Sequence, residues 1–292
     1  MRTHVLLGVM VLGLAAIVLP QAAQAHWGLE DPFKYKQLPD LQTGMDVNAT
    51  WKQTTKGPTG EPLPQPVPWY PYNKVLADDF ECKSQDPITD VHIWGSWLND
   101  LVNLNATFKL SIHDDIPAQP GVPGQPGTPS MPGQERRHWT FTPSQYFMQL
   151  WTTAEESFFE PNTNQIIGTD TKVYQYNFFI PKADAFVQEG TATNAKTYWL
   201  DVTAILPVDS PEVFGWKTSY QHWSDDAVFG DTSDPLVPPT AWHELRDPRV
   251  PDHPSLDMAF VITPEPATMA LLGLGVAGIL AKRRRSRTRQ AA

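Results

Sequence analysis

The feature that most constrains the fold of this chain is a series of short segments in which apolar and polar residues alternate. In the segment 89–97, Val91 and Ile93 share one face while His92 and Trp94 share the other. This period of two is that of a β-strand, because successive side chains point to opposite faces of a sheet. Six further segments are rich in β-branched or aromatic residues and are bounded by Pro, Gly, Asn or Asp. They are 75–80, 106–112, 173–180, 197–204, 213–218 and 257–262.

Helical patterns are scarce between the two ends of the chain. Only residues 183–189 predict a short helix, which Gly190 would end. Many half-buried strands without intervening helices favour an all-β fold, and we expect an antiparallel β-sandwich of the jelly-roll kind. Two stretches rich in Pro and Gly, 57–71 and 117–133, predict long surface loops, because proline lacks the donor that a ladder needs. We interpret 117–133 as an excursion within one domain, with a linker between two domains as the alternative.

Residues 263–292 consist of three unlike parts in a fixed order. These are the motif Pro264, Glu265 and Pro266, an uncharged apolar run at 267–281, and a basic tail at 282–289 that includes Arg283, Arg284 and Arg285. At about 1.5 Å per helical residue, the run falls short of a hydrocarbon core of about 30 Å. We therefore expect a marginal transmembrane helix with the basic tail in the cytoplasm and the body outside.

This arrangement resembles the PEP-CTERM sorting signal of exported bacterial proteins. The resemblance implies that the membrane anchor is transient and that an exosortase-type membrane protease processes the chain near the motif. A permanent C-terminal anchor is the alternative.

The N-terminus carries a matching export signal. A short apolar stretch, 5–19, precedes the small residues Ala23 and Ala25, which form the pattern that a signal peptidase recognises. We expect cleavage after Ala25, so that the mature chain begins at His26. A second membrane span is the alternative. The predicted organisation is a signal peptide at 1–25, a secreted β-sandwich at 26–262 and a sorting signal at 263–292. The protein is thus expected to cross the inner membrane of a bacterium and to reach the cell surface or the extracellular space.

The exported body is strongly acidic. Without Arg2 and the six basic residues of the tail, 15 Lys and Arg face 32 Asp and Glu, a net charge of about −17. We expect no nucleic-acid partner, because such a surface repels phosphate.

Cys82 is the only cysteine in the chain, which rules out an internal disulfide. We interpret this thiol, two residues after Phe80, as a small buried side chain.

Five segments of the body carry a second resemblance. They are ADDF at 77–80, PITDVHIWGSW at 87–97, SIHDDIP at 111–117, YWLDV at 198–202 and GWKTS at 215–219. They resemble a family of secreted β-rich domains that are often joined to PEP-CTERM tails, and the similarity covers about residues 35–262. It implies no catalytic residue. The sequence also lacks a Gly-x-Ser-x-Gly elbow, a phosphate-binding Gly loop and a dinucleotide fingerprint. We therefore expect a protein that is not an enzyme.

Three adjacent Asp pairs raise the question of a metal. They lie at 78–79, 114–115 and 225–226, each at the predicted edge of a strand. Calcium takes about six to eight oxygen ligands, which neighbouring loops could supply. Since adjacent residues of a strand point to opposite faces, each pair offers one side chain, and the calcium candidates are Asp79, Asp114 and Asp226. The alternative is that these residues cap turns and keep strand edges soluble.

Tryptophan is abundant, with 11 in 292 residues. A sugar ring can stack on an exposed indole, so a Trp-rich sandwich can bind extracellular polysaccharide, although core packing explains such rings equally well. The carbohydrate-binding candidates are Trp69, Tyr70, Trp94 and Trp223. The function we predict is a non-enzymatic protein of the cell surface or extracellular matrix. A carbohydrate-binding module is the first alternative and a secreted hydrolase the second.

Overall fold

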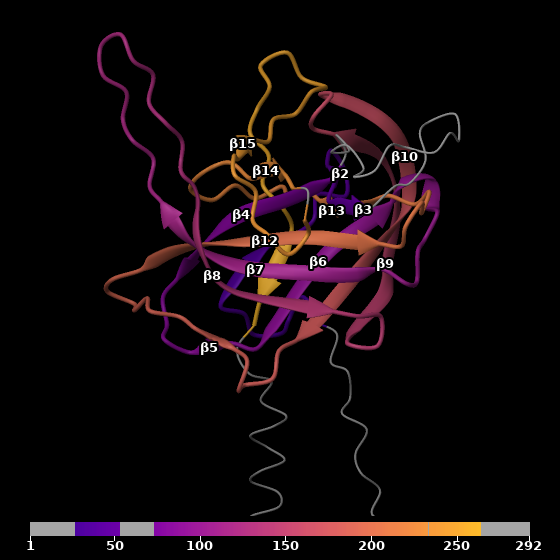
Figure 1. Ribbon diagram of the computed structural model, residues 1–292, viewed down its shortest axis with the longest axis horizontal. Coiled ribbons are helices and arrows are strands. Elements are labelled where there is room, and N and C mark those ends of the chain that lie inside the picture. Colours follow the sequence, from indigo (N-terminus) through magenta and orange to yellow (C-terminus); the bar gives the residue numbers. More distant parts are fainter. Residues whose placement is uncertain (1–26, 53–72, 233, 264–292) are drawn as a thin grey trace, which may run out of the picture.

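The computed structural model describes residues 27–52, 73–232 and 234–263, and nearly all of their regular structure is β (Figure 1). The strands are β1 (Tyr35–Gln37), β2 (Met45–Asn48), β3 (Thr50–Lys52), β4 (Lys74–Cys82), β5 (Pro87–Ile88), β6 (Asp90–Trp97), β7 (Thr107–Ile116), β8 (Met131–Phe141), β9 (Tyr146–Glu160), β10 (Gln165–Phe179), β11 (Phe186–Val187), β12 (Lys196–Leu206), β13 (Phe214–Lys217), β14 (Val228–Asp231), β15 (His243–Glu244) and β16 (Phe260–Ile262). The sole helical segment in these ranges is the 3-10 turn η1 (Leu98–Asp100). The all-β prediction is confirmed.

Most strands belong to two large sheets. The first sheet has the order β1-β16-β6-β10-β9-β2-β13, and the second has the order β15-β14-β4-β12-β7-β8, with β3 beside β12. Among the described strands, all pairings are antiparallel except β2 with β9 and β3 with β12. The sandwich-like arrangement agrees with the prediction. The predicted helix at 183–189 is wrong, because Phe186 and Val187 instead form strand β11 against β5.

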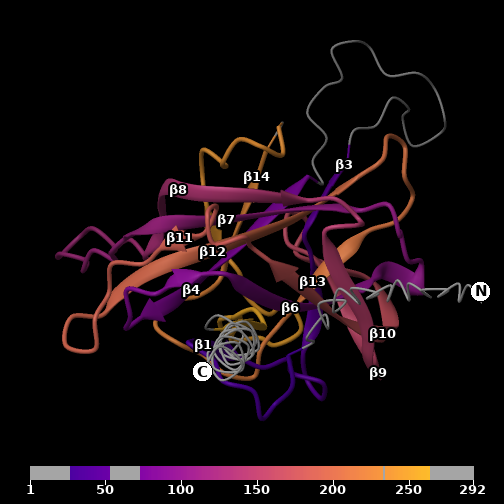
Figure 2. The ribbon, with the colours of Figure 1, turned by 90° about the horizontal axis from the view of Figure 1, so that it is seen from below.

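The main core lies between the two sheets, which Figure 2 shows as two layers. Val91 and Ile93 of β6 contribute to it from the first sheet, and Leu110 and Leu200 contribute from the second. The alternation expected for the segment 89–97 is confirmed, because Trp94 points away from this core and joins a separate buried cluster. Both faces of β6 are therefore buried.

The loop expected at 117–133 projects from the second sheet as a long ribbon (Figure 1). Its two arms pair through bridges between Gln119 and Thr128 and between Val122 and Gln125. The strands on either side of it, β7 and β8, pair with each other from end to end. The segment thus connects neighbours in one sheet, and residues 131–133 already belong to β8.

One part of the first sheet closes on itself. Strand β13 pairs with β2 on one side and with β6 on the other, so β6, β10, β9, β2 and β13 form a ring of five strands. The ring is narrow at Gly215, where an added Cβ would lie 2.7 Å from a side-chain carbon of Asp46 and 2.8 Å from the ring of Phe158. Only glycine permits this close approach.

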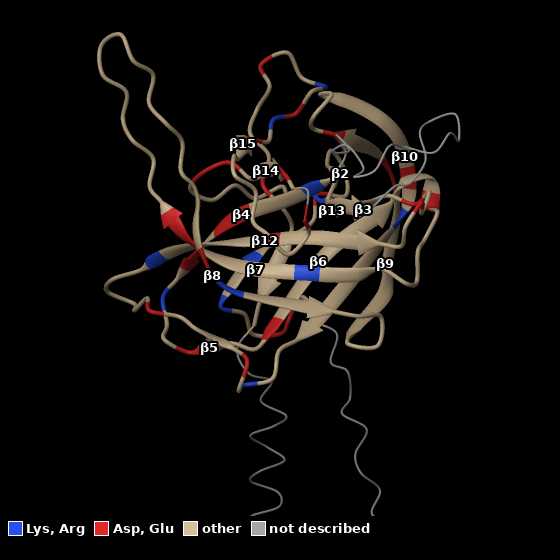
Figure 3. Ribbon diagram, viewed as in Figure 1, with Lys and Arg blue, Asp and Glu red and all other residues tan. Residues whose placement is uncertain are grey.

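Charged side chains are unevenly placed. In Figure 3, long stretches of the strands carry no charge, and Asp and Glu lie mainly near strand ends and in turns. No helix in the described ranges is long and apolar enough to cross a membrane. The apolar run predicted to form a membrane anchor, 267–281, lies outside those ranges.

Candidate functional site

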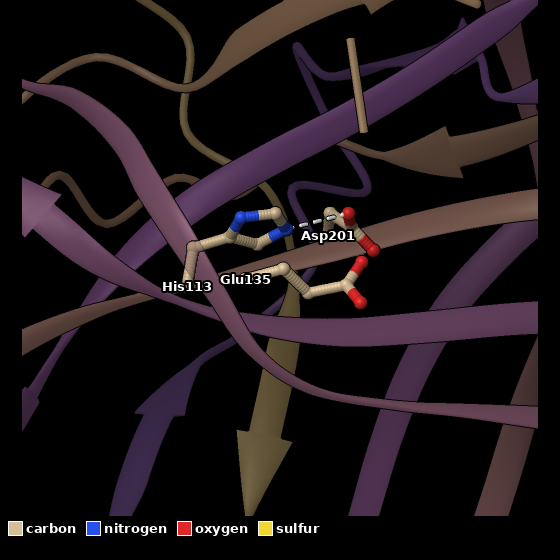
Figure 4. Close-up of side chains that lie close together, drawn as sticks. All are labelled: His113, Glu135 and Asp201. Atoms are coloured by element: carbon tan, nitrogen blue, oxygen red, sulfur yellow. Dashed lines mark hydrogen bonds and ion pairs between the residues drawn. The ribbon is translucent and has the colours of Figure 1, made fainter. Parts of the chain in front are cut away.

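Four ionisable side chains meet on the face of the second sheet that is turned away from the main core. Leu110 of β7 points into that core, so the residues that alternate with it, Lys109 and His113, point to the opposite face. Glu135 of β8 and Asp201 of β12 approach from the neighbouring strands, and Figure 4 shows both of them beside His113. Lys109, His113 and Asp201 are buried and Glu135 is half-buried. We call these four residues the β7 ion network.

Hydrogen bonds fix the protonation state of His113. Its Nε2 lies 2.8 Å from Asp201 Oδ2, and its Nδ1 lies 3.1 Å from the carbonyl oxygen of Gly133. Both partners are acceptors, so both ring nitrogens must donate, and the ring is an imidazolium. Burial alone would lower the pKa of His113, but the bond and the charge of Asp201 raise it above its ordinary value of 6.5.

The two carboxylates of the β7 ion network are held as anions. Burial alone would raise the pKa of Asp201, yet the charge of Lys109 and the hydrogen bond from His113 lower it. Lys109 Nζ lies 3.8 Å from Asp201 Oδ2 and 3.1 Å from Glu135 Oε2. Two cations therefore face two anions, and the network is balanced in charge.

This arrangement suits the joining of strands better than it suits a metal. His113, Glu135 and Asp201 each have a ligand atom within 4.8 Å of the others. A cation here would nevertheless have to remove a proton from His113, and the four side chains are already balanced in charge. The contacts link β7, β8 and β12 instead, through the ion pairs and hydrogen bonds of His113 and Lys109.

A cleft of about 390 Å³ lies beside this network, between the start of β8 and the strands β14 and β15. It is lined by apolar side chains, among them Met131 and Phe229, together with His243 and Arg246. Trp242 also lines it, and its ring lies 6.1 Å from that of His113. The cleft therefore reaches this indole, whereas His113, Glu135 and Asp201 are not among its lining residues.

The structure does not bring the three calcium candidates together. Asp79 is buried in β4, where burial raises its pKa to about 8. Asp114 accepts two hydrogen bonds from Arg136, both of 3.0 Å, and Asp226 lies 2.8 Å from Arg246. Among the described residues, two groups of acidic or His side chains have ligand atoms close enough for a metal, and none of these three Asp residues belongs to either.

The neighbour of one candidate links the two sheets instead. Asp78 of β4 accepts hydrogen bonds from Gln37 Nε2 of β1 at 2.8 Å, from the backbone N–H of Met258 at 2.7 Å and from that of Asp79 at 2.9 Å. Three donors satisfy this fully buried carboxylate. Two of them belong to the first sheet or lie just before one of its strands, namely Gln37 in β1 and Met258 before β16. We missed this role in the sequence.

The carbohydrate-binding candidates differ in how far their rings are buried. Trp94 is fully buried, with its ring centroid 5.9 Å from that of Trp27 and 5.6 Å from that of Trp151, so it offers no face to a sugar and is wrong as a candidate. Trp223 is half-buried, and its ring packs edge-on against Tyr35 at 5.8 Å. Trp69 and Tyr70 lie outside the described residues.

The signal residues also lie outside the described ranges. They are Ala23, Ala25 and His26 at one end, and Pro264, Glu265, Pro266, Arg283, Arg284 and Arg285 at the other.

Comparison with known families gives a match for the body and another for this tail. Residues 33–263 match the family described as Domain of unknown function (DUF7901). The chain belongs to this family.

A second match places the PEP-CTERM protein-sorting motif at residues 263–285 of the DUF7901 chain. Both resemblances seen in the sequence are therefore confirmed, and the two matches meet at Thr263. The motif supports export from a bacterial cell with a transient membrane anchor, and processing by exosortase, a membrane protein. No curated protein and no solved structure matches the chain.

The residues of the β7 ion network were not predicted from the sequence. One signal was available, since Lys109 and Asp201 are the single charged residues of the predicted strands 106–112 and 197–204, and His113 directly follows the first of these. A charge at such a position of a strand that is buried on both faces must be paired. What the sequence does not contain is the register that places β7 beside both β8 and β12.

Proposed function

We propose that this DUF7901 protein is a non-enzymatic domain of the bacterial cell surface or extracellular matrix. It is anchored briefly by its tail, processed near Pro264-Glu265-Pro266 and then released from the membrane. The observation that carries the proposal is the position of the sorting motif, which begins at residue 263, directly after strand β16 ends at Ile262.

The body holds its chain up to the start of the motif. Strand β16 lies between β1 and β6 in the first sheet. The next residue, Thr263, donates a backbone hydrogen bond to the carbonyl oxygen of Asp90 at 3.2 Å and a side-chain bond to Asp90 Oδ2 at 3.0 Å. A cut at or beyond Pro264 would remove none of these contacts. The processed body therefore keeps its full set of strands.

The lack of a spacer also bears on the anchored stage. With residue 263 fixed in the sheet and an apolar run starting at 267, the folded body would stand directly against the outer surface of the membrane. A membrane protease that cuts near the motif would then act at the boundary between the body and the bilayer. This arrangement favours a sorting signal that is processed after the body has folded.

The non-enzymatic part of the proposal is supported by the state of the β7 ion network. His113 donates from both nitrogens, and its neighbours are paired in charge. A general base needs a free nitrogen or carboxylate within reach of a substrate. These groups instead connect three strands of the second sheet.

Fractionation of the native host tests the proposal. Replacing both Pro264 and Pro266 by Ala should leave the precursor in the membrane fraction, because the processing motif is lost. A matched control replaces two prolines of the exposed ribbon, Pro123→Ala and Pro126→Ala, and should be released like the wild type. Release of the Pro264 and Pro266 variant at the wild-type rate would contradict the proposed role of the motif.

The basic tail provides a second arm of the same experiment. Replacing Arg283, Arg284 and Arg285 by Ser should reduce the amount of precursor held in the membrane before processing, because a marginal span without its cations slips or translocates. The proline variant should therefore increase the amount of precursor in the membrane fraction, and the arginine variant should decrease it. Equal behaviour of both would show that the tail acts as a simple anchor.

A further inference from the structure

The five-strand ring of the first sheet encloses a polar interior. Each of its strands contributes one side chain: Asp46 from β2, Ser96 from β6, Glu156 from β9, Asp170 from β10 and Lys217 from β13. All five are at most 5% exposed. Residues separated by as many as 171 positions in the sequence thus meet at one buried point. We call this group the ring cluster.

Several oxygen atoms of the ring cluster lack a hydrogen bond. They are Asp46 Oδ1, Ser96 Oγ, Glu156 Oε1 and Oε2, and Asp170 Oδ1 and Oδ2. One of these oxygens, Glu156 Oε2, forms a close ion pair with Lys217. Lys217 also donates a hydrogen bond to Asp46 Oδ2 at 3.2 Å. Asp170 is only 1% exposed, and neither of its oxygens has a hydrogen bond of full geometry, although Ser96 and Asp46 lie close enough to interact with it. A buried carboxylate in this state is costly unless something else binds it.

The charges of the ring cluster also favour a bound cation. Three carboxylates face the single ammonium of Lys217, which leaves two negative charges unbalanced. One ligand atom from each of Asp46, Glu156 and Asp170 lies within 4.8 Å of the other two. A divalent cation among these atoms would restore neutrality.

We propose that the ring cluster is a calcium site, with Asp46, Glu156 and Asp170 as its carboxylate ligands. Lys217 occupies Asp46 Oδ2 and Glu156 Oε2, and the remaining oxygens of the three carboxylates face the ion together with the hydroxyl of Ser96. Water completes the six to eight oxygen ligands that calcium takes.

The ligand set selects the kind of metal. Every donor is an oxygen, and no His or Cys belongs to the group. Zinc and copper prefer nitrogen or sulfur ligands, whereas carboxylate and hydroxyl oxygens suit calcium and similar hard cations. The site differs in position and in residues from the Asp pairs that stand out in the sequence.

A cleft lies at one end of the ring. Gly44, just before β2, and Thr218, just after β13, line a cleft of about 670 Å³ together with Asp40. Asp40 is close enough to act electrostatically on both Glu156 and Lys217. The cleft therefore places one carboxylate, that of Asp40, near the ring cluster, while the other Asp that lines it, Asp247, is paired with Arg249.

Calorimetry on the exported protein purified from its host tests the inference. After treatment with a chelator, titration with calcium chloride should show one ion bound per chain. The midpoint of thermal unfolding should rise by roughly 5–10 °C when free calcium is about 100-fold above its Kd.

Two variants and one matched control make the test specific. Asp170→Asn and Glu156→Gln should each abolish the calcium-dependent rise. In the chelator Asp170→Asn should unfold no lower than the wild type, because it loses a buried charge that had no full partner, whereas Glu156→Gln also loses its ion pair with Lys217 and should unfold lower. Glu155→Gln makes the same change at the adjacent, exposed position of β9 and should respond to calcium like the wild type. An unchanged midpoint across millimolar calcium, or a full response in Asp170→Asn, would overturn the inference.

Discussion

Replacing Asp201 by Asn tests the β7 ion network in isolation. Asparagine has the same shape, so it opens no cavity, and its side-chain oxygen can still accept the hydrogen bond from His113 Nε2. What is lost is the negative charge that lies 2.8 Å from His113 and 3.8 Å from Lys109. Removing one partner of a buried ion pair typically costs about 3–5 kcal/mol, because the other charge stays buried without compensation.

The expected size of the effect can be expressed as a melting temperature. A loss of 1 kcal/mol lowers the midpoint of a domain of about 150–250 residues by roughly 2–4 °C. Asp201→Asn should therefore lower it by roughly 6–20 °C in differential scanning calorimetry. The control is Asp184→Asn, which removes an exposed partner 3.2 Å from Arg137. An exposed pair contributes at most about 1 kcal/mol, so the control should change the midpoint little.

The difference in stability between the wild type and Asp201→Asn should also depend on pH. The folded pKa of His113 is raised above 6.5, so its contribution is complete below that pH and is lost as pH rises through the folded pKa. The folded pKa of Asp201 is lowered below 3.8, so its contribution is complete above that pH. The difference between wild type and Asp201→Asn should be greatest between these values and should shrink as the solution becomes alkaline. Equal losses in the two Asp variants, or a difference that grows with pH, would refute the reasoning.

Three other changes have expected outcomes. Gly215→Ala should lower the free energy of unfolding in urea by about 1–3 kcal/mol, because its Cβ would lie 2.7 and 2.8 Å from side-chain atoms of two neighbours. Replacing residues 120–127, the tip of the ribbon, by Asn-Gly should leave the thermal midpoint unchanged, since the arms are already paired and this dipeptide closes a hairpin. Trp94→Ala should cost about 3–5 kcal/mol and Trp223→Ala clearly less, as measured in urea, because only the first ring is fully buried.

Much of the fold could be predicted from local patterns. The alternation around Val91 and Ile93 placed β6 in the main core, and the other predicted segments located β4, β7, β12, β13, β16 and the second half of β10 within a few residues. Strand β9 was missed because most of its length is only half-buried, so its apolar residues show no clear period. The first half of β10 was missed for a related reason. Its pairing with β9 contains three register shifts, and each shift breaks the alternation on which the prediction depends.

Tertiary contacts explain the helix that did not form. Residues 183–189 have a helical pattern, but Phe186 pairs with Ile88 and packs edge-on against Tyr198 at 5.2 Å. Burial of this ring against the second sheet outweighs a helix propensity of a few tenths of a kcal/mol per residue.

The two buried clusters could not be found by adjacency in the sequence. The Asp pairs were conspicuous because their members are neighbours in the chain, yet Asp114 and Asp226 face arginines on the surface. Asp46 and Lys217 are single charges in short apolar strands, and they meet because β2 and β13 pair in the closed ring. Pairing between distant strands decides which charges share a site, and no local pattern records it.

The intact mass of the protein released by the native host is the most direct test of the central claim. If the DUF7901 body is exported, anchored briefly and processed at its sorting motif, the released form should begin at His26 and should lack the apolar run and basic tail that follow Pro264-Glu265-Pro266. A dominant, stable form that ends at Ala292 would show that the tail is a permanent anchor and would contradict the account.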